Sequence, residues 1–141
     1  MSLFVLRSVV YSATALAIAA CASATEPPDV RTELTASWNA VQTPPFNPEV
    51  FCLSFALAAD KSALEGSGTY CTDPWSGVVA VSGSSVGQNV RLDFRILSGV
   101  DSGYVMHFKG RLTSSSQMQG TMQFSDSGTQ TWQVAFTKSS S

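Results

Sequence analysis

The alternation of apolar and polar residues along the second half of the chain constrains its fold more than any other feature. Apolar side chains occupy alternate positions in 89–97, and the same period recurs in 103–113, 117–124 and 131–136. A period of two is typical of β-strands with one buried and one solvated face, and helical spacing fits none of these runs. The predicted inward set is Val90, Leu92, Phe94, Ile96, Tyr104, Met106, Phe108, Gly110, Leu112, Met118, Gly120, Met122, Phe124, Trp132, Val134 and Phe136.

Four further runs precede residue 89. Alternation is visible in 51–58 and 64–71, while Val79 and Val81 mark a short strand and 34–38 marks the first one. Short turns join the eight runs, and no segment between them is long enough for a crossover helix, so the pattern predicts a meander. We expect an all-β fold, an eight-stranded antiparallel up-and-down barrel, because closure removes the unpaired edges of the sheet. A two-sheet sandwich is the alternative.

The N-terminal segment is predicted to direct export. Residues 3–20 are mostly apolar or small, with Arg7 as their single charge, which is typical of a signal peptide. Residues 18–21 (Ile, Ala, Ala and Cys) resemble the lipobox of bacterial lipoproteins. That resemblance implies cleavage before Cys21, transfer of a diacylglycerol to its side chain, and a lipid anchor that holds the protein on a membrane.

The chain is accordingly expected to have four parts: a lipoprotein signal peptide at 1–20, a lipidated tether at 21–33, a β-barrel domain at 34–138 and a tail at 139–141. No Asp follows Cys21, and by the same resemblance this favours the outer membrane, with the protein facing the periplasm. Cleavage after Ala24 is the alternative, because 22–24 (Ala, Ser, Ala) also suit the ordinary signal peptidase. It would give a secreted or soluble periplasmic protein.

The two remaining cysteines are predicted to form a disulfide. If Lys61 and Ser62 are the tip of a hairpin, Cys52 and Cys71 stand directly opposite each other on its outward face. Opposed strand residues come close enough for a disulfide, and an exported chain folds in an oxidising compartment.

The first predicted strand carries a family resemblance. Residues 34–39 (Leu, Thr, Ala, Ser, Trp, Asn) resemble the Gly-x-Trp opening of the calycins, the lipocalin and avidin-type barrels, with Ala36 in the place of Gly. In that family a basic side chain packs across the tryptophan. The resemblance therefore implies barrel closure by Lys138, which continues the inward parity of the last strand, over Trp38. It also implies a binding function, without indicating what is bound.

The inward face suggests either a ligand cavity or a filled core. Side chains that would line a cavity are Trp38, Tyr70, Phe94, Tyr104, Phe108 and Trp132. Gly66, Gly68, Gly110 and Gly120 also face inward, the last two directly opposed. These glycines either leave space for an apolar ligand or make room for large aromatic side chains and allow the strands to coil.

No pattern of an enzyme emerges. His107 is the single histidine and is expected opposite Asp93 on the outward face, as a surface pair. There are no paired carboxylates at fixed spacing, no phosphate-binding glycine loop and no zinc pattern. We therefore expect no catalytic residue, no metal and no cofactor, and the net charge of −2 gives no indication of nucleic-acid binding.

The expected function is that of a lipid-anchored, extracytoplasmic and non-catalytic barrel that binds a small apolar or amphipathic molecule. The alternative is an envelope protein-interaction or inhibitor module with a filled core. In that alternative Trp75, within the turn-forming segment 73–77, is the expected contact with a partner protein, although it could instead plug the mouth of the barrel.

Overall fold

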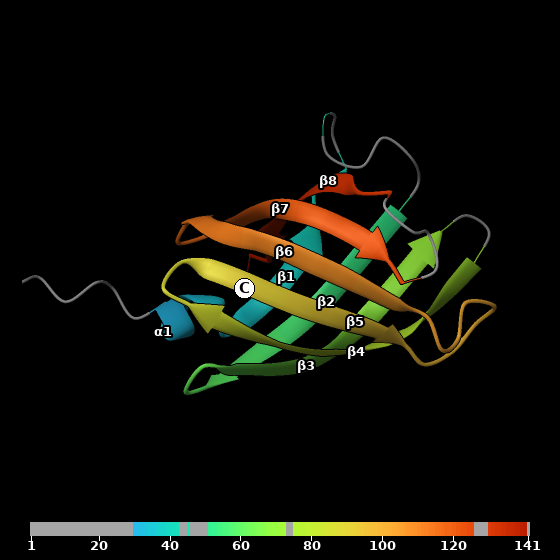
Figure 1. The fold of residues 1–141 in the computed structure, drawn as a ribbon, viewed down its shortest axis with the longest axis horizontal. Coiled ribbons are helices and arrows are strands. Elements are labelled where there is room, and N and C mark those ends of the chain that lie inside the picture. Colours follow the sequence, from blue (N-terminus) through green and yellow to red (C-terminus); the bar gives the residue numbers. More distant parts are fainter. Residues whose placement is uncertain (1–29, 43–44, 46–50, 73–74, 126–129, 141) are drawn as a thin grey trace, which may run out of the picture.

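Eight strands follow one another around a closed antiparallel barrel, in which each strand pairs with its neighbours in the chain and β1 pairs with β8. The computed structural model describes residues 30–42, 45, 51–72, 75–125 and 130–140 (Figure 1). The elements are α1 (Val30–Leu34), β1 (Ala36–Ala40), β2 (Phe51–Asp60), β3 (Ala63–Thr72), β4 (Trp75–Val86), β5 (Asn89–Ile96), β6 (Val105–Ser114), β7 (Gln117–Phe124) and β8 (Trp132–Lys138). The predicted barrel is confirmed, and the sandwich is excluded. The predicted signal peptide and Cys21 lie outside the described residues.

The register of the hairpins follows the alternation. Cys52 pairs with Cys71 across β2 and β3, and the two form a disulfide with a Cα–Cα distance of 5.0 Å. The register also places Gly110 opposite Gly120. Asp60 pairs with Ala63, so Lys61 and Ser62 form the tip of this hairpin as expected, and Lys61 adopts a positive φ of 55° there.

The start of the fold differs from the prediction. Leu34 does not open the first strand but ends the short helix α1, and its side chain is completely buried. The indole N–H of Trp38 donates to the Leu34 carbonyl at 3.1 Å, so the last turn of the helix is fixed under the end of the barrel. The Thr35 amide donates to the Arg31 carbonyl at 3.0 Å, and β1 begins only at Ala36. Residues 30–33, which were expected in the tether, are therefore helical.

The two ends of the barrel differ in construction (Figure 1). At the helix end, α1 lies beside the tight turns that join β2 to β3, β4 to β5 and β6 to β7. At the opposite end, which we call the loop end, β1, β3, β5 and β7 end and β2, β4, β6 and β8 begin. No helix in the described ranges is long and apolar enough to cross a bilayer.

Aromatic rings fill the middle of the barrel. The centre of the Phe55 ring on β2 lies 4.9 Å from that of Phe94 on β5 and 5.1 Å from that of Phe136 on β8. The centres of the Phe108 ring on β6 and the Phe136 ring are also 5.1 Å apart. None of these pairs joins strands that are neighbours in the sheet. The rings therefore meet across the lumen rather than along its wall. Phe94 and Phe136 expose none of their surface, so no water-sized void borders them.

The inward glycines are positions where the strands come too close for a side chain. A Cβ atom added to Gly66 or Gly68 would collide with the backbone of β2, and one added to Gly120 would collide with the backbone of β6. At Gly110 it would meet both the backbone of β7 and the tip of the Phe108 ring. The glycines thus allow the strands to coil around the aromatic core, and they do not border open space.

We expect Gly66→Ala and Gly68→Ala each to lower the free energy of unfolding by about 1–3 kcal/mol, because the new methyl group has no space. Urea unfolding of the oxidised protein measures the change. Ser67→Ala, at the exposed position between them, is the matched control and should change stability by less than about 0.5 kcal/mol. Alanine variants as stable as the parent would show that the glycines face a cavity.

Candidate functional site

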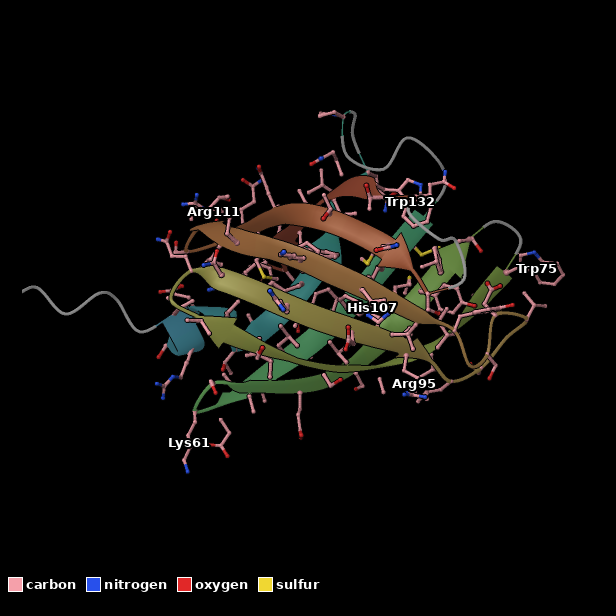
Figure 2. All side chains as sticks on the ribbon, viewed as in Figure 1. Lys61, Trp75, Arg95, His107, Arg111 and Trp132 are labelled. Carbon is pink, nitrogen blue, oxygen red and sulfur yellow. A yellow bond between two sulfur atoms is a disulfide. The ribbon has the colours of Figure 1, made fainter. Side chains whose placement is uncertain are left out.

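Exposed apolar side chains concentrate at the loop end. The described residues include six large apolar side chains that are exposed, and five of them lie at this end. These five, which we call the apolar patch, are Trp75 (50% exposed), Val78 (45%), Leu97 (53%), Val100 (58%) and Tyr104 (40%). Figure 2 shows Trp75 extending from the loop end away from the barrel. Exposed apolar side chains that gather on one part of a small domain are typical of a binding surface.

Two members of the patch are held by strand geometry. The Leu97 amide donates to the Val78 carbonyl at 2.8 Å, which continues the pairing of β4 with β5 by one residue. Their chain neighbours Val79 and Ile96 fill the inward positions and are buried. Val78 and Leu97 must therefore both point outward, side by side.

The connection between β5 and β6 holds Val100 and Tyr104. It turns at Gly99 and Gly103, whose φ angles of +92° and +97° suit glycine and few other residues. The Gly103 amide donates to the Ile96 carbonyl at 2.9 Å, and the Tyr104 amide donates to the Asp101 carbonyl at 3.1 Å. These bonds make the loop a folded element, so the side chains of the patch have fixed positions.

Tyr70 holds the connection between β5 and β6 against the barrel. Its side chain is buried, and its hydroxyl donates to Asp101 Oδ2 at 3.2 Å. Its ring covers Gly77, where an added Cβ would lie 2.5 Å from the ring carbon Cε1. Burial raises the pKa of the Tyr70 hydroxyl, and the nearby Asp101 charge and its hydrogen bond raise it further. The group therefore stays protonated and keeps donating to Asp101.

The six predicted ligand-lining residues do not share one space. Phe94 and Phe108 belong to the ring cluster, and Trp38 is buried near α1 at the opposite end from Tyr70. Trp132 is half-buried, and its ring packs edge-on against Phe124 at 5.2 Å. Tyr104 has inward parity but lies one residue before β6 begins, beyond the part of the barrel that the strands enclose. Its side chain is therefore exposed.

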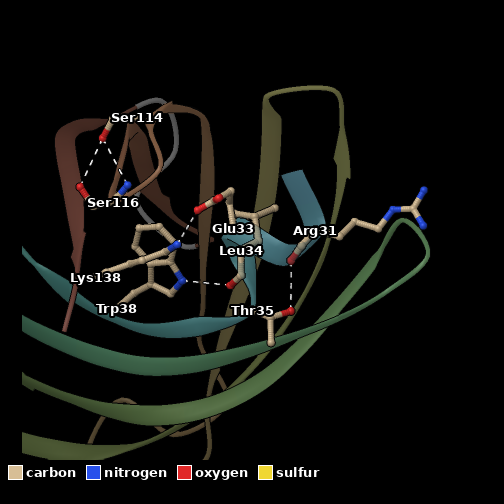
Figure 3. Close-up of polar contacts among 8 residues, drawn as sticks. All are labelled: Arg31, Glu33, Leu34, Thr35, Trp38, Ser114, Ser116 and Lys138. Atoms are coloured by element: carbon tan, nitrogen blue, oxygen red, sulfur yellow. Dashed lines mark hydrogen bonds and ion pairs between the residues drawn. The ribbon is translucent and has the colours of Figure 1, made fainter. Parts of the chain in front are cut away.

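The predicted contact of Trp38 with Lys138 is present at the helix end (Figure 3). Lys138 Nζ lies 5.6 Å from the centre of the Trp38 ring and 2.8 Å from Glu33 Oε2. Sequence analysis missed Glu33 because it lies in the segment expected to be a tether. The ion pair joins α1 to the last strand, so it closes this end of the barrel.

The predicted surface pair also forms. His107 Nδ1 lies 2.6 Å from Asp93 Oδ1, and about half of each side chain is exposed. Within the described ranges no three His, Cys, Asp or Glu side chains are grouped as a metal site requires. The pair lies on the outer face, where it lines a surface hollow together with Arg91 and Lys109.

Sequence analysis identified Trp75 as a possible partner contact but missed Val78, Leu97 and Val100. A signal was available for two of them. Val78 and Leu97 each stand next to a buried residue in an alternating run, which gives them outward parity despite their apolar side chains.

No protein-family model matches the chain, and a search of curated proteins found no match either. The function must therefore be inferred from the chain's own residues.

We expect the stability of the folded protein to fall above about pH 10, as a raised tyrosine pKa requires. A group whose pKa is higher in the folded state contributes fully to the free energy of unfolding at any pH below its unfolded-state pKa. This contribution is lost as the pH rises through the pKa of the group in the folded state. Tyr70→Phe should reduce this alkaline loss, and at pH 8 it should lower the free energy of unfolding by about 1 kcal/mol. Urea unfolding between pH 8 and 11 measures both effects.

Tyr104→Phe is the control at pH 8, because the Tyr104 hydroxyl makes no hydrogen bond within the part of the chain that the structure describes. It should leave stability at that pH unchanged. An unaltered pH profile in Tyr70→Phe would contradict the role of the Tyr70–Asp101 bond.

Proposed function

We propose that the protein is a lipid-anchored, non-catalytic module of the bacterial cell envelope that binds a partner protein through the apolar patch at its loop end. The observation that carries the proposal is the combination of a lumen packed with aromatic rings and apolar side chains gathered at one end. A filled barrel binds with its outer surface, and large apolar side chains exposed on fixed loops suit that purpose.

The patch has the chemistry of a protein interface. An exposed tryptophan is among the residues that contribute most to binding between proteins, and Trp75 stands at the start of β4 with half of its surface exposed. The Tyr70–Asp101 bond and the loop hydrogen bonds order the patch before a partner arrives. Binding therefore requires little further loss of conformational entropy.

The proposed anchor would orient this surface. Eight residues separate Cys21 from Val30, and a chain of that length spans at most about 28 Å. It enters the fold at α1, so the helix end is the end held near the membrane and the apolar patch points away from it. A diacyl modification would make such an anchor stable, and the lipobox resemblance favours the outer membrane.

A small apolar ligand is the competing function, supported by the barrel fold and by the calycin resemblance at Trp38 and Lys138. Barrels of eight strands hold either their own side chains or one small ligand. In this barrel the Phe55, Phe94, Phe108 and Phe136 rings occupy the middle of the lumen, which is why we favour a partner protein.

The proposal predicts a discrete protein adduct when the photoreactive residue p-benzoylphenylalanine replaces Leu97 in the full chain and intact cells are irradiated. Trp75→Ala in the same chain should reduce the yield of that adduct at least ten-fold, because it removes the largest contact of the patch. Lys61→Ala, at a hairpin tip of the opposite end, should leave the yield unchanged. Gel mobility and mass spectrometry identify the adduct.

Membrane fractionation of the same cells tests the anchor separately, since Cys21→Ser should release the protein into the soluble fraction. An adduct that Trp75→Ala does not weaken, or a complete lack of adducts at Leu97, would contradict the binding role.

A further inference from the structure

The basic residues of this acidic chain are concentrated on one outer face. Four of its eight Lys and Arg residues alternate along the outward side of β5 and β6: Arg91, Arg95, Lys109 and Arg111. The same side of these two strands carries a single carboxylate, Asp93, which is paired with His107. The net charge of −2 is thus distributed unevenly, and this face, which we call the basic face, is positive.

Two of these cations are placed directly against each other. Arg91 pairs with Lys109 across β5 and β6, an arrangement that is unfavourable for like charges. Among the described residues, no carboxylate lies within ion-pair distance of either side chain. Both line two adjoining hollows of the outer surface, each of about 460–470 Å³. An anion seated between Arg91 and Lys109 would relieve their repulsion and accept their hydrogen bonds.

The most exposed large apolar side chain borders the same face. Val86 is 75% exposed at the end of β4 and lines one of the two hollows together with Arg91 and Lys109. It stands at the helix end, beside the tight turn where the Arg111 guanidinium donates to Gln88 Oε1 at 3.2 Å. An apolar side chain at a hairpin tip, flanked by cations, has the composition of a surface that contacts lipid headgroups.

We infer that the helix-end part of the basic face, which comprises Arg91, Lys109 and Arg111, rests together with Val86 on an anionic phospholipid surface, and that Arg91 and Lys109 hold lipid phosphate groups between them. Charge complementarity favours an anionic partner, and the place where the chain enters the fold favours the membrane. The eight residues after Cys21 end at α1, at the same end as Val86, so they keep this end within about 28 Å of the anchored cysteine. The orientation rests on the proposed anchor, whereas the binding chemistry does not.

On this inference, the helix end contacts lipid and the loop end contacts a partner protein. Arg95 lies at the far end of β5, next to the loop end, and the remaining three basic residues of the face lie nearer to the helix end. Figure 2 shows Arg111 and Lys61 toward the helix end and Trp75 at the other. A protein held on lipid by the first end would still present its apolar patch to a partner.

The test is flotation of the exported full chain carrying Cys21→Ser, which removes the anchor, with vesicles of 70% phosphatidylcholine and 30% phosphatidylglycerol in 100 mM salt. The partition coefficient should be at least ten-fold higher than with pure phosphatidylcholine vesicles. The double change Arg91→Ser and Lys109→Ser should lower it at least ten-fold, because each basic residue near an anionic surface contributes about five-fold. Val86→Ser should lower it about three-fold.

Two matched controls come from the loop end. Arg95→Ser removes a cation from the same strand, and Leu97→Ser removes an exposed aliphatic side chain; neither should change the partition coefficient more than two-fold. Equal binding to both kinds of vesicle, or a loss caused by Arg95→Ser or Leu97→Ser and not by the changes at Arg91, Lys109 and Val86, would overturn the inference. Binding to polyglutamate without binding to anionic vesicles would overturn it in favour of an acidic protein. Because the anchor is absent from this assay, these outcomes are independent of the fractionation and photocrosslinking results.

Discussion

The contact of four phenylalanine rings across the lumen is the constraint on which the rest of this structure depends. Phe55 and Phe136 come from strands that pair neither with each other nor with the strands of Phe94 and Phe108, so the packing of the four rings sets the width of the barrel from within. Edge-to-face pairs of this kind stabilise by more than the area that they bury. With the lumen occupied, the outer surface is the part of the barrel that is left for the binding we propose.

The two ends of the barrel are stabilised by different interactions. At the helix end, α1 reinforces the seam between β1 and β8 through Leu34, Glu33 and the cation of Lys138 over Trp38. At the loop end, Tyr70 and Asp101 hold the connection after β5, which leaves apolar side chains exposed on a rigid support. The same chain therefore closes one end tightly and leaves apolar side chains exposed at the other.

Much of the fold could be predicted because alternation is a local signal. The parity of each run indicates which side chains face inward, and a tight turn then fixes the register, which is why the Cys52–Cys71 pair could be located from the sequence. Parity does not show how far inward a side chain reaches or where the wall ends. Tyr104 has inward parity but lies beyond the enclosed part of the barrel and is exposed.

The remaining misses have the same physical origin. Leu34 fits the period of the first strand and the buried end of a helix equally well, and the hydrogen bonds from Trp38 to Leu34 and from Thr35 to Arg31 distinguish the two. Whether inward glycines leave a cavity depends on distances between strands, which no local pattern contains. The clashes of an added Cβ at Gly66 and Gly68 with the neighbouring backbone resolve that question.

A single comparison tests most directly whether the lumen is filled: titration of the full chain and its Phe94→Ala variant with benzene, followed by NMR chemical shifts of the core methyl groups. Removal of the Phe94 ring should open a dry apolar cavity that binds benzene saturably, as cavities of this kind do. The parent protein should show no saturable shift. Saturable binding by the parent, with shifts centred on the residues around Phe55 and Phe136, would contradict a filled lumen and restore the small apolar ligand as the leading function.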